Sequence, residues 1–355
     1  MKRINLNKLM RPHIRKISPE IRRDLDACAI LDGTENMFGY SPKIRDLIHI
    51  DTRLNIAPDP SCRELKASLQ KYHQVSYGKL FVGNGAIDVV DHFFRIFLQP
   101  GDNVIIPSPT YPVLNFEVDV NFGTLKKIEL EKDFYLNPTK IINAIDQNTK
   151  IILLVNPQNP TGNIIPKRDI AKIAQAAYSK GVLLVIDEVY AEYARENNIE
   201  LIDEYNNVFI IRSFSKAFGL AGLRVGYGLG SEELIKLLKK RPPLKISRVS
   251  QLAAKYALED ADHFYKLRDQ IDSEKTWLHG ELNNLDGVKA YMTRTNFLIA
   301  KFPAKRFRER LEILAKNRIF VKNLCKFPLL KHHVRIGIGT RKQNELFLKE
   351  LKKLV

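Results

Sequence analysis

The sequence predicts an α/β protein whose central sheet is mainly parallel. Two short apolar runs rich in branched residues, 151–155 and 182–186, flank a segment at 167–180 whose apolar residues recur at helical spacing. A third apolar run follows at 208–211. Such runs are typical of strands that helices cover on both faces. A right-handed crossover places the carboxyl ends of these strands at one edge of the sheet, where open α/β sheets bind ligands.

The first candidate binding feature lies between a strand at 80–82 and a helix predicted at 86–98. Gly83-Asn84-Gly85 joins them, directly before Ala86. Glycines before a helix leave backbone N–H groups accessible, and the helix dipole favours a negative charge there. Gly85 and Ala86 are therefore predicted to bind a phosphate, with a simple turn as the alternative.

Two further strands end in proline-rich loops, which cannot continue a strand. The strand at 103–106 leads to Tyr111, and the strand at 151–155 leads to a loop that carries Asn159. The Tyr111 ring could stack on a planar cofactor, although a packing role is the common one for an aromatic residue in such a loop. The Asn159 amide could donate a hydrogen bond to an oxygen on that ring.

The strand at 182–186 ends directly on Asp187, with Tyr190 three residues later. A buried carboxylate such as Asp187 stabilises a protonated pyridinium nitrogen, which a cofactor ring needs in order to accept electrons. The alternative for Asp187 is a turn or helix N-cap residue. The Tyr190 hydroxyl could bond the phenolic oxygen of the same ring.

The strand at 208–211 leads to Ser213-Phe-Ser215-Lys216, and Arg224 follows. A lysine amine can form a Schiff base with pyridoxal phosphate (PLP), while hydroxyls and a guanidinium can hold its phosphate. A solvated surface lysine is the alternative. Because the parallel strands bring the residues named above to the same edge of the sheet, the sequence favours the cofactor site.

A second, smaller α+β domain is predicted after Gly230. Helical segments, interrupted at Pro242-Pro243, precede a strand at 297–301 and another that contains Arg335. Apolar residues alternate around Arg335, so its side chain is predicted to point away from the core face, toward solvent or toward a site. We expect an N-terminal arm at 1–35 that joins the small domain, a large cofactor-binding domain at 36–230 and the small domain at 231–355.

Six motifs in order carry a resemblance to a known family. The chain resembles the fold type I PLP-dependent aminotransferases of class I/II, especially the histidinol-phosphate aminotransferase group and its threonine-phosphate decarboxylase relatives. The resemblance extends from about Arg11 to Thr340. The motifs are G-N-G-A (83–86), P-x-Y (109–111), N-P-x-N-P-T-G (156–162), D-E-V-Y (187–190), S-x-S-K-x-F-x-L-A-G-L-R-x-G (213–226) and V-R-I-G-I-G-T (334–340).

The resemblance implies a role for each matched residue. Lys216 would be the Schiff-base lysine and would move the proton, and Asp187 would pair with the pyridine nitrogen. The remaining implied roles are the phenolic oxygen for Asn159 and Tyr190, ring stacking for Tyr111, the phosphate for Gly85, Ala86, Ser213, Ser215 and Arg224, and the substrate carboxylate for Arg335.

The substrate pocket departs from the family pattern. The family's Y-P-D-P tyrosine, which reaches into the neighbouring subunit's site, is Ala57 here, and its N-terminal P-Y is Pro19-Glu20. A phosphate-binding arginine is replaced by Lys322, which keeps the charge but loses the fork geometry. Asn36, in the segment that matches N-E-N-P without its proline, is expected to contact substrate.

Composition narrows the choice of partners. Lysine and arginine outnumber aspartate and glutamate by 57 to 40, for a formal net charge of +17 at pH 7. Such a balance can indicate nucleic acid, an anionic membrane surface or anionic metabolites. The basic residues are spread through amphipathic helices without an RNP or zinc-finger motif, so we expect small anionic substrates and no nucleic acid.

Cysteines and hydropathy bear on location. Three scattered cysteines without a C-x-x-C pair predict a reducing compartment, no metal site and no disulfide framework. The first residues lack the apolar core of a signal peptide, and no apolar run is long enough to span a bilayer. A cytoplasmic protein with no membrane partner is expected.

These observations together predict a homodimeric PLP-dependent aminotransferase. It would move an amino group between an amino acid such as glutamate and a small phosphorylated keto or aldehyde acceptor. A decarboxylase of a phosphorylated amino acid, such as threonine or serine phosphate, uses the same cofactor and is the main alternative. A binding module without catalysis is a third interpretation, which the full set of matched residues disfavours.

Overall fold

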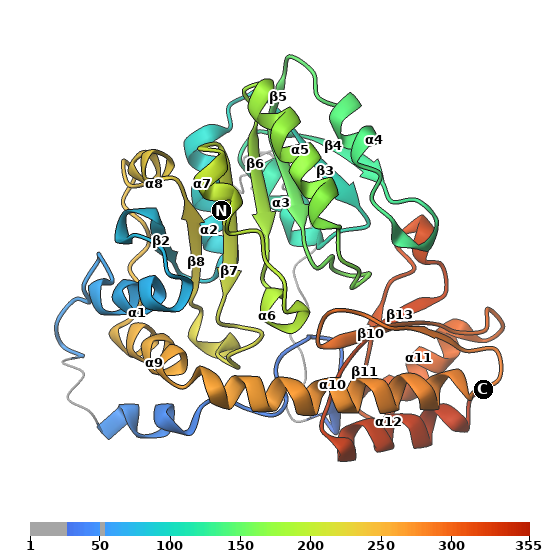
Figure 1. Cartoon of the computed structure of the whole chain (residues 1–355). Coiled ribbons are helices and arrows are strands. Elements are labelled where there is room, and N and C mark those ends of the chain that lie inside the picture. Colours follow the sequence, from blue (N-terminus) through green and yellow to red (C-terminus); the bar gives the residue numbers. More distant parts are fainter. Residues whose placement is uncertain (1–26, 50–53) are drawn as a thin grey trace, which may run out of the picture.

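A seven-stranded sheet forms the centre of the computed structural model, which describes residues 27–49 and 54–355 (Figure 1). Neighbouring strands are parallel except at β8, which runs antiparallel to both of its neighbours. This confirms the predicted α/β class with a mainly parallel sheet. In spatial order the strands are β2 (Leu80–Gly83), β8 (Gly226–Gly230), β7 (Val208–Ser213), β6 (Leu183–Asp187), β5 (Thr149–Val155), β3 (Asn103–Ser108) and β4 (Thr124–Glu129).

Helices cover both faces of this sheet. Alternate residues of β5 enter different cores: Leu153 packs with α2 and α3, whereas Leu154 packs with α5. A strand buried on both faces needs apolar residues at successive positions, which explains its unbroken apolar run. The helices up to α8 are α1 (Arg63–His73), α2 (Ala86–Phe97), α3 (Pro112–Val120), α4 (Pro138–Asn143), α5 (Lys167–Ser179), α6 (Ala191–Ala194), α7 (Leu201–Glu204) and α8 (Glu232–Leu238).

The C-terminal part builds a second, antiparallel sheet of order β12-β13-β10-β9 beside the long helix α10 (Figure 1). The short β1 pairs in parallel with β11, so the end of the predicted arm joins this part. The elements are β1 (Ala29–Ile30), α9 (Arg248–Glu259), α10 (Ala261–Asn283), β9 (Lys289–Tyr291), β10 (Phe297–Lys301), α11 (Phe307–Lys316), β11 (Ile319–Phe320), β12 (Lys322–Asn323), β13 (His333–Gly337) and α12 (Arg341–Lys352).

The predicted domain boundaries stay a prediction. The predicted boundary at Gly230 lies between helices α1 and α9 in the sequence, and these two helices pack against each other. Most of the arm at 1–35, including Pro19-Glu20, lies outside the described residues.

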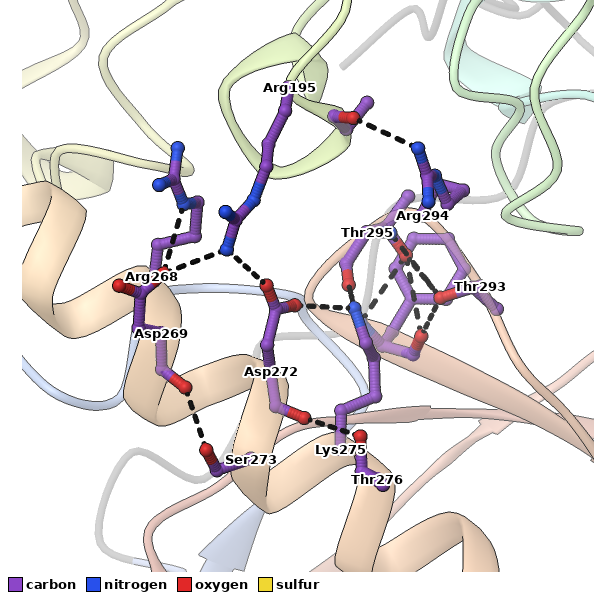
Figure 2. Close-up of polar contacts among 12 residues, drawn as sticks. Arg195, Arg268, Asp269, Asp272, Ser273, Lys275, Thr276, Thr293, Arg294 and Thr295 are labelled. Carbon is purple, nitrogen blue, oxygen red and sulfur yellow. Dashed lines mark hydrogen bonds and ion pairs between the residues drawn. The ribbon is translucent and has the colours of Figure 1, made fainter.

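An ion-pair network connects α6 to α10 (Figure 2). Arg195, at the C-cap of α6, lies 2.8 Å from Asp269 and 3.2 Å from Asp272. On the other side of Asp272, Lys275 donates to that carboxylate at 2.9 Å and to the Thr295 carbonyl at 2.8 Å. The network therefore links α6, α10 and the turn before β10.

Candidate active site

A cavity of about 530 Å³ opens at the carboxyl ends of β5, β6 and β7, which is a normal size for a small-molecule site. The strand ends bring Asn159, Asp187 and Lys216 to this one cavity, as predicted from the carboxyl ends of parallel strands. The predicted site residues that line this cavity are Ala86, Tyr111, Asn159, Asp187, Tyr190, Ser213, Ser215, Lys216, Arg224, Lys322 and Arg335.

The N-terminus of α2 has the form of a phosphate cradle. Gly85 has a positive φ of 93°, and a Cβ there would lie 2.6 Å from Nη2 of Arg224. A Cβ on Gly226 would likewise lie 2.3 Å from the backbone nitrogen of Ala86. Both glycines thus leave room at a helix start where N–H groups and the dipole favour an anion. Arg224 Nη1 also lies 3.3 Å from the Ser215 hydroxyl, so the cradle fits the phosphate of PLP.

Asp187 ends β6 deep in the cavity and is 6% exposed. Its Oδ1 accepts the Val189 N–H at 3.1 Å, so it also fills the turn role considered above. Burial raises the pKa of Asp187 to about 7, while that N–H bond lowers it. A carboxyl that lacks full solvation favours a positive partner, which a protonated ring nitrogen would supply.

Lys216 begins a chain of polar contacts between residues that line the cavity. Its Nζ donates to Thr34 Oγ1 at 2.8 Å, and that hydroxyl lies 3.0 Å from the Tyr190 hydroxyl. Tyr190 in turn accepts from Asn159 Nδ2 at 3.5 Å. Arg335 Nη1 donates to Asn159 Oδ1 at 2.7 Å. Four of the predicted residues therefore belong to one network, and Thr34 joins them.

Arg335 is buried, with 8% exposure, so its side chain does not point into bulk solvent. Its neighbours Val334 and Ile336 face the apolar core, while its guanidinium points to Asn159 and donates to the Asp32 carbonyl at 2.6 Å. Burial lowers the pKa of Arg335, but a guanidinium stays charged under these conditions. A fixed cation therefore lies in the cavity wall.

Two lysines line the same cavity as this cation. Lys322 and Lys326 are both exposed and both line the cavity. Desolvation first, and then the positive charges of Lys322 and Arg335, lower the pKa of Lys326. Within the part of the chain that the structure describes, neither lysine forms an ion pair with a carboxylate. The uncompensated charge favours an anionic ligand.

A buried ion cluster lies behind the strand ends. Arg212 of β7 contacts Glu188 at 3.1 Å and Glu192 of α6 at 2.8 Å. Burial raises the pKa of both carboxyls, and the guanidinium opposes that rise. Glu188 also accepts from the Asn198 side chain at 2.7 Å. The cluster thus joins the segment that carries Asp187 and Tyr190 to the strand that leads to Lys216.

Asn36 has different neighbours from those expected. Its Nδ2 donates to the Ala217 carbonyl at 3.0 Å, and its Oδ1 accepts the Phe38 N–H. It is not among the residues that line the cavity, so substrate contact by Asn36 stays a prediction, and these bonds favour support of the chain beside Lys216. Gly85 contributes through its backbone conformation, as described above.

Two residues of the cavity, Thr34 and Lys326, were not predicted from the sequence. Thr34 occupies the first position of the segment that matches N-E-N-P, where the family pattern has an asparagine, and only its contact with Lys216 reveals its place in the site. Lys326 lies four residues after Lys322, in a stretch without strong periodicity. In the described ranges, no group of three or more His, Cys, Asp or Glu side chains could hold a metal ion. No helix in the described part is long and apolar enough to cross a membrane.

Comparisons with known proteins agree with this geometry. The family model for aminotransferase class I and II matches residues 40–351. The chain is 36% identical to a histidinol-phosphate aminotransferase of Methanocaldococcus jannaschii, over 92% of this chain and 88% of that one. It is 32% identical to one of Ruminiclostridium cellulolyticum, over 98% of each chain.

A solved structure shows the same fold. The histidinol-phosphate aminotransferase of Sinorhizobium meliloti, in complex with pyridoxal-5'-phosphate, superposes with a TM-score of 0.85 at 24% identity. The match covers 92% of this chain and 91% of that one.

Proposed function

Because the chain belongs to the class I and II aminotransferases and is a PLP-dependent enzyme, we propose that it transfers an amino group from an amino acid such as glutamate to a small phosphorylated keto or aldehyde acceptor, which gives a phosphorylated amine of the histidinol-phosphate type. The observation that carries this choice of acceptor is the set of cations Lys322, Lys326 and Arg335 that line one cavity. The donor carboxylate and the acceptor phosphate enter the site in separate half-reactions, and these three cations offer a positive partner to each. The names of the curated relatives favour amino transfer over decarboxylation.

The residues around the cavity divide between cofactor and substrate. Lys216 would hold PLP covalently, Asp187 would pair with its ring nitrogen, and Tyr111 would stack on the ring. Lys322 and Lys326 would bind the acceptor phosphate. The other assignments that we propose are Asn159 and Tyr190 at the phenolic oxygen, Gly85, Ala86, Ser213, Ser215 and Arg224 at the cofactor phosphate, and Arg335 at the substrate carboxylate.

The chemistry of this chain then rests on few groups. When bound, PLP supplies an electron-accepting ring that makes the proton on the substrate α-carbon acidic. The Lys216 amine would take that proton from the α-carbon and return it to C4′ of the cofactor. Asp187, as a carboxylate, keeps the ring nitrogen protonated. Arg335 orients the substrate through paired N–H donors, which a lysine could not reproduce.

The covalent assignment can be tested by reduction. Borohydride treatment of the yellow holoenzyme followed by peptide mapping is expected to place the cofactor on Lys216. Lys216→Ala should lose both the reducible attachment and turnover, whereas Lys239→Ala, on an exposed lysine outside the cavity, should retain both. Label on a different lysine would overturn the assignment.

The acceptor class can be tested by separating the two half-reactions. A charge-assisted contact contributes about 1.5–3 kcal/mol, so Lys322→Ala should lower the acceptor half-reaction by roughly ten- to a hundredfold. The glutamate half-reaction should hardly change. Equal losses in both would indicate a structural role for Lys322. Release of CO2 without any need for 2-oxoglutarate would instead favour the decarboxylase.

The assembly state belongs to the same proposal. Gln251 donates to the Asp59 carbonyl at 3.0 Å and to the Ile246 carbonyl at 2.9 Å, so two chain segments lie side by side. Both segments expose large apolar side chains, which favours a homodimer. These are Leu54 (75% exposed), Ile56 (58%) and Leu244 (55%). Light scattering should give twice the 40.8 kDa of one chain, and a mass of one chain would contradict the dimer.

The reach of the Ala57 segment into a neighbouring subunit's site stays a prediction.

We also propose a cytoplasmic location, because all three cysteines are unpaired, as in a reducing compartment. Fractionation of cells with a tagged chain tests it.

A further inference from the structure

We propose that the Thr34 hydroxyl is a positioning group that holds the Lys216 amine for proton transfer and couples it to Tyr190. The hydroxyl lies between them, 2.8 Å from Lys216 Nζ and 3.0 Å from Tyr190 Oη. A threonine hydroxyl has one proton and two acceptor positions. It can therefore accept from the amine and donate to the phenol at the same time.

The backbone at Thr34 supports a functional role. Its φ is 66°, in the left-handed region, where a β-branched residue is rare and strained. Such strain persists only when the surroundings impose it, and it concentrates at active sites. Thr34 is also 2% exposed, so solvent does not explain the need for a hydroxyl.

A buried asparagine holds this conformation. Asn296, 1% exposed, donates through Nδ2 to the Thr34 carbonyl at 2.9 Å and to the Glu35 carbonyl at 3.3 Å. Asn296 follows Thr295, whose carbonyl accepts from Lys275 in the network of Figure 2. The turn before β10 thus holds Thr34 at the cavity. In the same turn, the backbone N–H of Arg294 donates to the Gly162 carbonyl, in the loop that carries Asn159, at 2.8 Å.

The consequence concerns the direction of the Lys216 amine. An amine that has to take and return a proton must keep its lone pair toward the substrate, and a flexible lysine side chain does not ensure this. A bond from one amine N–H to Thr34 removes rotational freedom at Nζ. The bond from Thr34 to Tyr190 makes the phenol a stronger donor toward the cavity, because chains of hydrogen bonds polarise one another. Loss of the hydroxyl should therefore affect both neighbours.

The test compares two substitutions of Thr34 in the holoenzyme. Thr34→Val keeps the branched shape and the backbone strain but removes the hydroxyl, whereas Thr34→Ser keeps the hydroxyl. A neutral hydrogen bond contributes about 0.5–1.5 kcal/mol, so Thr34→Val should slow the glutamate half-reaction by roughly three- to tenfold. Thr34→Ser should stay within about twofold of the parent, on the same estimate.

A second readout does not depend on turnover. The visible absorbance of bound cofactor titrates with the proton on the nitrogen that joins it to Lys216. Its midpoint should move to higher pH in Thr34→Val, because Tyr190 becomes a weaker donor, and should stay in place in Thr34→Ser. Equal behaviour of the two variants, or an unchanged midpoint and half-reaction in Thr34→Val, would overturn the role of the hydroxyl.

The inference rests on Lys216 as the cofactor lysine, and the outcomes are distinguishable. Peptide mapping that places the cofactor on another lysine would overturn the proposed function itself. Mapping to Lys216 with no effect of Thr34→Val would overturn only the role of Thr34. A lower unfolding temperature in both Thr34 variants, with normal titration midpoints in both, would show that Thr34 is merely structural and would also overturn the proposal.

Discussion

Two charge clusters adjoin helix α6, and they differ in their access to water. The cluster of Arg212, Glu188 and Glu192 is buried, with side-chain exposures of 4% or less. In the network of Figure 2, Arg195 is 53% and Asp269 63% exposed. The interatomic distances are similar, near 3 Å in both.

Ion pairs with similar N···O distances are therefore expected to contribute different amounts to the stability of the fold. Removing one partner of a buried pair leaves an unsolvated charge, at a cost of about 3–5 kcal/mol. Exposed pairs contribute about 0–1 kcal/mol, because water already solvates each partner. The buried cluster positions the strand ends beneath the site, whereas the exposed network adds a weak link between α6 and α10.

The largest effect is expected from Arg212→Ala. Two carboxyls with side-chain exposures of 3% or less would lose their cation, so the free energy of unfolding should fall by about 3–5 kcal/mol. Urea denaturation of the cofactor-free chain measures it. The triple variant Arg212→Met, Glu188→Gln, Glu192→Gln, which removes all the charges, should recover much of the loss. A loss below about 1 kcal/mol for Arg212→Ala would mean that the buried cluster contributes no more to stability than an exposed ion pair does.

The next effect is a pH dependence from Asp187, a buried carboxyl without a full ion pair. Its pKa is about 7 in the folded chain against 3.8 as the ordinary value, so the folded state binds the proton more tightly. The stabilisation is complete below pH 3.8 and declines as the pH rises to 7, by up to about 4 kcal/mol at 1.36 kcal/mol per unit. Thermal unfolding of the cofactor-free protein between pH 4 and 8 should show this decline.

Asp187→Asn is the matched control, because the amide does not titrate. Its unfolding temperature should change less across that pH range than the parent's. Bound cofactor should also flatten the parent profile, since the ring nitrogen would supply the missing cation. Identical pH profiles for the parent and Asp187→Asn would contradict the raised pKa.

Lys275 lies between the two extremes, because its side chain is 7% exposed although its partner Asp272 is 32% exposed. Lys275→Met keeps the packing but leaves the Thr295 carbonyl without this donor. We expect a loss of about 1.5–3 kcal/mol, the usual value for a hydrogen bond to a charged group. Chemical denaturation measures it, and a loss as small as that of an exposed pair would show that burial of one partner is not enough.

The smallest effect is expected for Arg195→Ala. Its two partners, Asp269 and Asp272, remain solvated when the guanidinium is removed, so the loss should be under about 1 kcal/mol. The difference from the parent should vanish in high salt, because exposed charges are screened. A loss that persists in 1 M salt would mean that Arg195 acts through packing instead.

The sheet and its site wall were predictable because their signals are local. The runs at 151–155, 182–186 and 208–211 lie within β5, β6 and β7, except for Val182, which directly precedes β6. Parallel strands expose their ends together, which brings Asn159, Asp187 and Lys216 to one cavity. The position of Arg335 was partly predictable. The alternation of apolar residues predicted that its side chain points away from the core, but only the fold shows that it donates hydrogen bonds to Asn159 and to the Asp32 carbonyl.

By itself, the sequence determined the α/β class, the parallel strands whose ends carry the candidate residues, and the family to which the motifs point. Each of these depends on residue types at short spacing, so local patterns suffice. Only the tertiary structure decided that Thr34 meets Lys216 across 182 residues of chain, and that Arg212 meets Glu192 behind the site. Such contacts depend on the relative placement of distant segments, which hydrophobic periodicity does not encode, and burial then sets how much each one contributes.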